Sequence, residues 1–121
     1  MKGLLLDRPA TTEAFVKGMY KQPQSEAYFK KVSEAALMTP TNSAVTLLTN
    51  FFFSSDSVWM QKMKSFHRPL LFIGVAGKET MFREFNKEVK IKYAVIPDAG
   101  HAIFVDKPVQ FNEIVKGFIA K

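Results

Sequence analysis

The residues best suited to chemistry are those at positions 97–101, which read Pro-Asp-Ala-Gly-His. They directly follow residues 93–96, an apolar run that is typical of a buried strand and ends in Val95 and Ile96. His101 is therefore expected on a loop at the carboxyl end of a strand, where open α/β sheets bind ligands. An imidazole placed there can act as a general base. A base needs a group to activate, and the 121 residues contain no obvious nucleophile motif.

The other candidate groups are better interpreted as structural than as catalytic or metal-binding. His67 has no second ligand at the spacing that a zinc site needs. Gly74 and Gly77 are not followed by the Gly-Lys-Ser/Thr sequence of a phosphate loop, so tight turns explain them. Asp98 is typical of a turn, and Asp56 is predicted to cap a helix. We therefore predict neither a metal site nor a cofactor.

The composition is that of an ordinary globular domain, with 47% hydrophobic and 23% charged residues in a chain of 121. The net charge is +6, but the lysines are spread out without a basic run, so nucleic-acid binding is not expected. The absence of cysteine excludes disulfides, thiolate catalysis and cysteine-based zinc sites. The apolar run near the first residues is too short for a signal peptide. No apolar run in the chain approaches the roughly 20 residues that are needed to cross a membrane. We expect a cytoplasmic protein without membrane contact.

The elements that must position His101 fall into two halves. Residues 1–66 have the apolar spacing of helices throughout. Residues 11–13, Thr-Thr-Glu, predict a cap ahead of one helix, and Ser25 predicts a cap ahead of the next. Pro40 is expected to end that helix, and residues 42–43, Asn-Ser, to start another.

The second half alternates strands with helices. The predicted elements are a strand at 70–73, a helix at 78–87, a strand at 89–96 and a helix at 109–119 that begins beside Pro108. This order is a βαβα unit, whose strands pair in parallel through a right-handed crossover. Two strands alone leave unpaired edges. We therefore expect either self-association or a companion chain that completes the sheet.

Three segments of the second half resemble motifs of the α/β-hydrolase family. Residues 68–74 (RPLLFIG) are similar to a late strand of that family, and 95–101 (VIPDAGH) to its last strand and catalytic-histidine loop. Residues 107–119 are similar to its C-terminal helix. The resemblance implies a partial α/β-hydrolase fold of the α/β class, in which residues 67–121 form the last strand-helix-strand-helix part of the core.

The first half resembles the helical cap that many members insert before their last strands. Residues 15–20, 25–28 and 39–42 are similar to cap helices of the esterase and haloperoxidase-like branch. The resemblance therefore implies that residues 1–66 form a cap-like segment. It covers nearly the whole chain and corresponds to the C-terminal part of a family member.

The resemblance also implies roles for particular residues. His101 matches the catalytic base of a Ser-His-acid triad. The family places an Asp about where this chain has Gly77, so the orienting acid falls to Glu79 as the nearest carboxylate, or Glu79 is simply an exposed residue of a helix's first turn. The Gly-x-Ser-x-Gly turn that carries the family's nucleophile does not occur in the 121 residues.

Two functions follow as alternatives. In the first, the chain is the C-terminal part of a hydrolase that cleaves a small ester-like or related acyl substrate, and it is inactive without the nucleophile. In the second, it is a non-catalytic fragment or interaction domain that self-associates through its open sheet edge, and His101 is idle.

Overall fold

The structure is a computed structural model that describes residues 2–53 and 56–120. These residues form two compact units. The helical unit consists of residues 2–19 and 23–53, and the sheet unit of residues 20–22 and 56–120. Residues 20–22 lie in the sequence between two helices of the helical unit, but they belong to the sheet unit. No helix in the described residues is both long and apolar enough to span a membrane.

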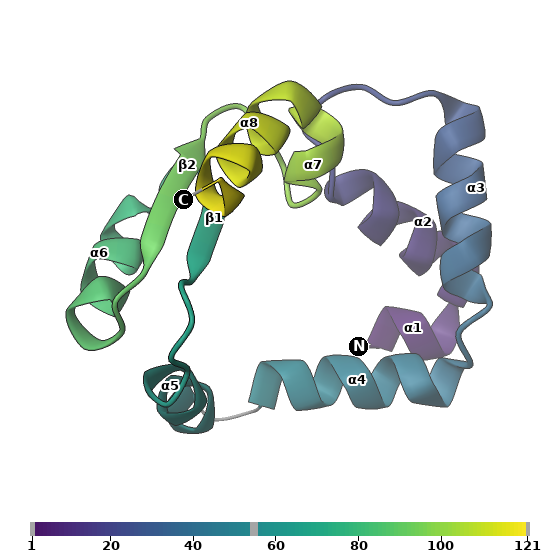
Figure 1. The fold of residues 1–121 in the computed structure, drawn as a ribbon. Helices are drawn as coiled ribbons and strands as arrows, with labels where there is room; N and C mark the ends of the chain where they lie inside the picture. Colours follow the sequence, from purple (N-terminus) through teal and green to yellow (C-terminus); the bar gives the residue numbers. More distant parts are fainter. Residues whose placement is uncertain (1, 54–55, 121) are drawn as a thin grey trace. The chain divides into compact units, whose positions relative to one another are not determined.

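The helical unit contains four helices, of which the last three were predicted from the apolar spacing and the first was not. They are α1 (Lys2–Leu6), α2 (Arg8–Gly18), α3 (Glu26–Leu37) and α4 (Thr41–Phe53) (Figure 1). Ser25 caps α3 as predicted, because its side chain accepts a hydrogen bond from the Tyr28 amide at 3.2 Å. The break at Pro40 is also confirmed, and α4 starts one residue earlier than expected.

The predicted cap at residues 11–13 is wrong. Helix α2 begins at Arg8, where the Asp7 side chain accepts from the Ala10 amide at 3.1 Å and Pro9 occupies the first turn. An Asp cap followed by Pro is a stronger start signal than two threonines, and Thr12 is instead buried inside the helix.

Arg8 joins three helices of this unit. Its guanidinium donates to the Thr41 hydroxyl at 2.8 Å and to the Ala36 carbonyl at 3.2 Å, and also to the Thr39 carbonyl. The start of α2 is thereby tied to the end of α3 and the first residue of α4. Helix ends leave carbonyl groups without partners, and the planar guanidinium satisfies two of them at once.

The sheet unit contains the predicted βαβα order around a two-stranded parallel sheet. Its elements are α5 (Asp56–Lys64), β1 (Leu71–Val75), α6 (Glu79–Glu88), β2 (Lys92–Ile96), α7 (Ile103–Asp106) and α8 (Pro108–Ile119). Leu71 lies opposite Lys92 and Val75 opposite Ile96. Asp56 is the first residue of α5, and the capping role predicted for its side chain falls outside what the structure describes.

Helices cover the two faces of the strand pair (Figure 1). On the α6 face, Phe82 packs its ring against Phe72 at 5.9 Å and Tyr93 at 5.6 Å between centroids. On the other face, the Lys92 ammonium lies 5.6 Å from the centre of the Phe118 ring of α8. Successive strand residues point to opposite faces, which explains why the neighbours Lys92 and Tyr93 contact different helices.

Gly74 is where α6 and β1 approach most closely. A Cβ atom built on it would lie 2.6 Å from two atoms of the buried Phe82 ring. Only a residue without a side chain lets the ring reach the strand, so the glycine that ends the predicted apolar run lies inside β1 and not in a turn.

The second strand is shorter than residues 89–96. Val89 ends α6 by donating its amide to the Phe85 carbonyl, and the Ile91 amide donates to Asn86 Oδ1 at 2.8 Å. Both Val89 and Ile91 are buried. The Ile91 amide bonds locally to the Asn86 side chain in place of a neighbouring strand. The alternating apolar residues at 89 and 91 therefore belong to a buried connection and not to the strand. The short helix α7 also went unpredicted, since four residues carry too little periodicity to detect.

Candidate functional site

His101 lies where the sequence predicted it, on the loop between β2 and α7. Its side chain is exposed, while Ala99 and Ala102 on either side of it are buried, with 6% and 3% of their surface exposed. Asp98 adopts a left-handed conformation with φ 58°. Asp tolerates that region better than most residues, which supports its predicted role as a turn residue. The loop is therefore anchored at two points, with the imidazole presented to solvent.

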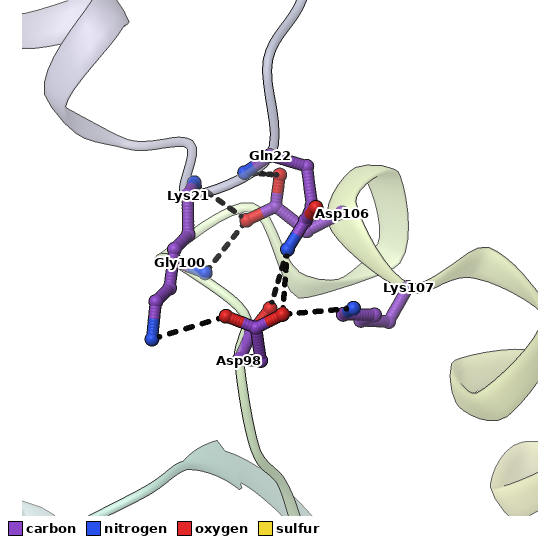
Figure 2. A network of polar contacts seen from close by, with 6 residues as sticks. All are labelled: Lys21, Gln22, Asp98, Gly100, Asp106 and Lys107. Atoms are coloured by element: carbon purple, nitrogen blue, oxygen red, sulfur yellow. Dashed lines mark hydrogen bonds and ion pairs between the residues drawn. The ribbon is translucent and has the colours of Figure 1, made fainter.

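A buried carboxylate that sequence reasoning missed holds this loop. Asp106, the last residue of α7, is 7% exposed and accepts a 2.6 Å hydrogen bond from the Gly100 amide. It also accepts from the Lys21 amide at 2.9 Å and the Gln22 amide at 3.2 Å (Figure 2). The sequence offered one clue, an Asp directly before the Lys107-Pro that opens the last helix.

The protonation of Asp106 reflects opposing effects. Burial favours the neutral acid and acts to raise the pKa of the carboxyl group. The three backbone amides stabilise the charged form, and together with the nearby Lys107 ammonium they outweigh burial, so the pKa lies below its ordinary value. Asp106 is thus a carboxylate at neutral pH, paired by N–H groups of the backbone.

Asp98 forms a second, more exposed set of contacts with the same segment (Figure 2). Its carboxylate lies 3.3 Å from the Lys21 ammonium and 3.2 Å from that of Lys107. The Gln22 side-chain amide donates both to the Asp98 carboxylate at 3.0 Å and to its carbonyl at 2.9 Å. The hydrogen bonds from Lys107, Lys21 and Gln22 lower the pKa of Asp98.

Glu79, the predicted orienting acid, is the first residue of α6, and its side chain is half-buried. Gly77, at the position where the family's Asp was expected, has φ +86°, and a Cβ atom there would meet nothing within 4 Å. Both positions follow β1 as His101 follows β2, and parallel strands end at one edge of a sheet. None of the hydrogen bonds or ion pairs among the described residues joins Glu79 to His101.

His67 lies in the connection between α5 and β1, and its side chain is exposed. Across residues 2–53 and 56–120, no three His, Asp or Glu side chains gather closely enough to hold a metal ion.

Comparison with known proteins identifies the architecture. No protein-family model and no curated protein sequence matches the chain. The structure is similar to that of a bromoperoxidase from Bacillus anthracis, with a TM-score of 0.83 and 21% identity over 99% of this chain. It is also similar to an esterase, EaEST, from Exiguobacterium antarcticum, with a TM-score of 0.77 and 12% identity over 99% of this chain.

In both cases the chain corresponds to 46% of the other protein. It thus spans less than half the length of the structures it resembles. The likeness identifies the fold as part of the α/β-hydrolase fold, in agreement with the sequence motifs at residues 68–74 and 95–101.

Proposed function

We propose that this chain is the histidine-bearing part of an α/β-hydrolase that cleaves a small ester-like or related acyl substrate. His101 is the general base, and the nucleophilic serine is supplied by residues outside these 121. The observation that carries the proposal is an exposed imidazole on an anchored loop at the carboxyl end of a parallel strand, within this fold. Glu79 is the candidate for the acid that orients the imidazole.

The chemistry assigns one proton to His101 in each half-reaction. The imidazole takes the proton of the serine hydroxyl while the oxygen attacks the acyl carbon, and it returns that proton to the departing alcohol. A water molecule then attacks the acyl carbon of the acyl-serine while His101 accepts its proton, and His101 returns that proton to the serine oxygen as the carboxylic acid leaves. The reaction requires no cofactor. The exposure of the imidazole leaves it free to meet both the serine and water.

The decisive experiment compares the two histidines in the complete enzyme, in which the serine-bearing part is present. His101→Ala is expected to lower kcat for a p-nitrophenyl ester by on the order of 10⁶-fold, because a triad without its base loses most of its rate enhancement. His67→Ala is the matched control, since that exposed side chain lies outside the loop, and its activity should be unchanged. Equal activity of His101→Ala and the unaltered enzyme would refute the proposal.

The isolated 121-residue chain provides a second test. It should hydrolyse the same ester no faster than free imidazole does, and a fluorophosphonate that labels activated serines should not modify it. A rapid turnover that His101→Ala abolishes would mean that the chain carries its own nucleophile.

We also propose that the sheet is completed by another polypeptide segment, either the serine-bearing part or a second copy. The support lies in β1, in which Leu71, Phe72 and Ile73 are only half-buried although parallel strands are normally covered on both sides. Light scattering on the isolated chain tests this directly. If the isolated chain stays monomeric at every concentration, completion of the sheet by a second copy is contradicted. If the chain also fails to bind the serine-bearing part, completion by that part is contradicted.

A further inference from the structure

Asp106 is the one charged side chain that is buried among the described residues. It is 7% exposed, and its two oxygens accept from three backbone amides. A backbone amide cannot turn away from its acceptor by a side-chain rotation. The three amides therefore fix the Asp106 carboxylate from several directions. Hydrogen bonds to a charged acceptor are also roughly twice as strong as neutral ones.

Two of these bonds share one oxygen. Oδ2 accepts from both the Gly100 amide at 2.6 Å and the Lys21 amide at 2.9 Å, while Oδ1 accepts from the Gln22 amide. Gly100 immediately precedes His101, and the other two donors lie 85 and 84 positions before Asp106 in the chain. A single carboxylate therefore fastens the residue before the imidazole to segment 20–22 (Figure 2).

The contacts of Asp98 reinforce the same connection from the solvent side. Lys21 and Gln22 reach it through their side chains, and Lys107 closes the set. Asp98 and Lys21 are exposed, so water and salt compete with these contacts and each contributes little. The buried backbone bonds to Asp106 are therefore the ones that hold the loop, and those to Asp98 are secondary.

We propose that Asp106 is a positioning residue for the reaction: by fixing the Gly100 amide against segment 20–22, it sets the direction in which His101 presents its imidazole. This inference rests on the proposed function of His101. Asp106 touches neither substrate nor the reacting atoms and acts through the backbone. A general base must hold its nitrogen within hydrogen-bond reach of the serine hydroxyl, and an error of about 1 Å in such geometry costs about 100-fold in rate.

Asp106→Asn is the most informative change because it keeps the size of the side chain. One of its two oxygens becomes an NH₂ group, which cannot accept from the amides and meets a donor with a donor. In the complete enzyme we expect kcat to fall about 10- to 100-fold while KM changes little, since the binding of substrate does not depend on this group. A loss confined to KM would contradict a positioning role.

The matched control is Asp98→Asn, which removes the exposed carboxylate that contacts the same segment. It leaves all three bonds to Asp106 in place, and kcat should stay within about two-fold. A loss as large as that of Asp106→Asn would place the positioning role on the exposed network and refute the assignment.

Amide resonances of the 121-residue chain give a readout that does not need catalysis. The short bond from Gly100 should place its amide proton far downfield and protect it from exchange. In Asp106→Asn both properties should be lost at Gly100, Lys21 and Gln22, with the amide of Ile96 in β2 unaffected. Unchanged resonances would overturn the proposal.

If Asp106→Asn does not fold, the unaltered chain still decides the question. Lowering the pH should move the Gly100 amide upfield in one step below about pH 4, as Asp106 takes up its proton. His101, Lys21, Lys107 and Asp98 are the other titratable groups around this site, and Asp98 is the second carboxyl group among them. The step should therefore persist in the Asp98→Asn background, and its disappearance there would overturn the proposal.

The two proposals fail in different ways. If His101→Ala leaves the complete enzyme active, the proposed function is wrong, whatever Asp106→Asn does. If His101→Ala inactivates the enzyme and Asp106→Asn loses the Gly100 signature while keeping its kcat, only the positioning role is wrong.

Discussion

The contacts inside the helical unit differ in kind from the contacts inside the sheet unit. Among the described residues, six buried apolar side chains belong to the sheet unit, from Phe82 to Ala102, whereas Val16 alone belongs to the helical unit. The other buried side chains of the helical unit are the hydroxyls of Thr12 and Ser33. Among the described side chains, the sheet unit thus has a small apolar core, whereas polar contacts between helix ends link the helical unit.

The apolar side chains of the helical unit are found on its surface instead. Five large ones are more than 60% exposed: Leu5, Leu6, Phe15, Met38 and Leu47. Amphipathic helices gain their stability from burying such side chains, so these five residues contribute little to the stability of the unit. The pattern fits the proposed function, in which cap helices cover other residues of a complete enzyme. The buried apolar side chains and the residues of the proposed site both belong to the sheet unit.

Phe82→Ala should have the largest effect and should fall on the sheet unit alone. The ring is 4% exposed and fills the space above Gly74 between Phe72 and Tyr93. Its loss leaves a cavity, with an expected cost of about 3–5 kcal/mol in the free energy of unfolding. Hydrogen exchange, followed by segment, should show the loss in β1 and β2. Met81→Ala on the same helix, at a side chain 52% exposed, is the control and should cost far less.

Arg8→Ala should have the largest effect on the helical unit. It removes donors from the Thr41 hydroxyl and from carbonyls at the end of α3, for an expected cost of about 2 kcal/mol. Exchange should accelerate in α2, α3 and α4, while the strands stay protected. Arg8→Lys keeps the charge without the planar fork and should give an intermediate loss. If Arg8→Ala instead weakened the strands as much as the helices, the two units would not be distinct.

Such tests bear on features that were only partly evident in the sequence. The strand pair, its parallel direction, the helix order and the loop of His101 were all predictable, because long apolar runs and proline breaks are local signals. The start of α2 at Arg8 was missed because two threonines offer a cap signal that competes with Asp7. The start of β2 was missed because the Ile91 amide donates to the Asn86 side chain, a local bond that leaves no periodic signal.

The polar contacts of the site could not be predicted, for a physical reason. Asp106 meets Lys21 and Gln22 across 85 and 84 positions of chain, and such a pairing leaves no periodic signal in the sequence. The assignments of Glu79 as acid and of residues 1–66 as a cap stay predictions. What sequence could indicate was the loop that carries His101, and what it could not indicate was the group that fixes that loop.

The two units should lose stability at opposite extremes of pH. In the sheet unit the pKa values of Asp98 and Asp106 are lowered on folding, so their stabilisation is present above about pH 4 and is lost as the pH falls through the folded values. In the helical unit, the hydrogen bond to Glu13 and the charge of Glu26 raise the pKa of Lys17. That contribution is present below the ordinary lysine pKa of 10.5 and is lost as the pH rises through the folded value.

We therefore expect acid to accelerate hydrogen exchange first in the loop of His101, and alkali to loosen first the contact of Lys17 with α3. The alkaline effect should be the weaker of the two because Lys17 is well exposed to solvent. Lys17→Met should remove the alkaline change and leave the acid change intact. The same response of both units at both extremes would contradict the distinction.

The smallest expected effect comes from one exposed intrahelical ion pair in each unit. In α6 the Lys87 ammonium lies 2.7 Å from the Glu84 carboxylate, whereas in α3 Lys30 and Glu34 are 3.9 Å apart. Glu N-terminal to Lys is also the favourable order along a helix, and only the α6 pair has it. Glu84→Gln should cost about 0.3 kcal/mol at low salt and Glu34→Gln less, with both differences vanishing in about 1 M salt. A larger loss of stability for Glu34→Gln than for Glu84→Gln would mean that surface ion pairs stabilise the helical unit more than its Arg8 contacts suggest. That result would contradict the contrast between a sheet unit stabilised by apolar packing and a helical unit stabilised by polar contacts of Arg8.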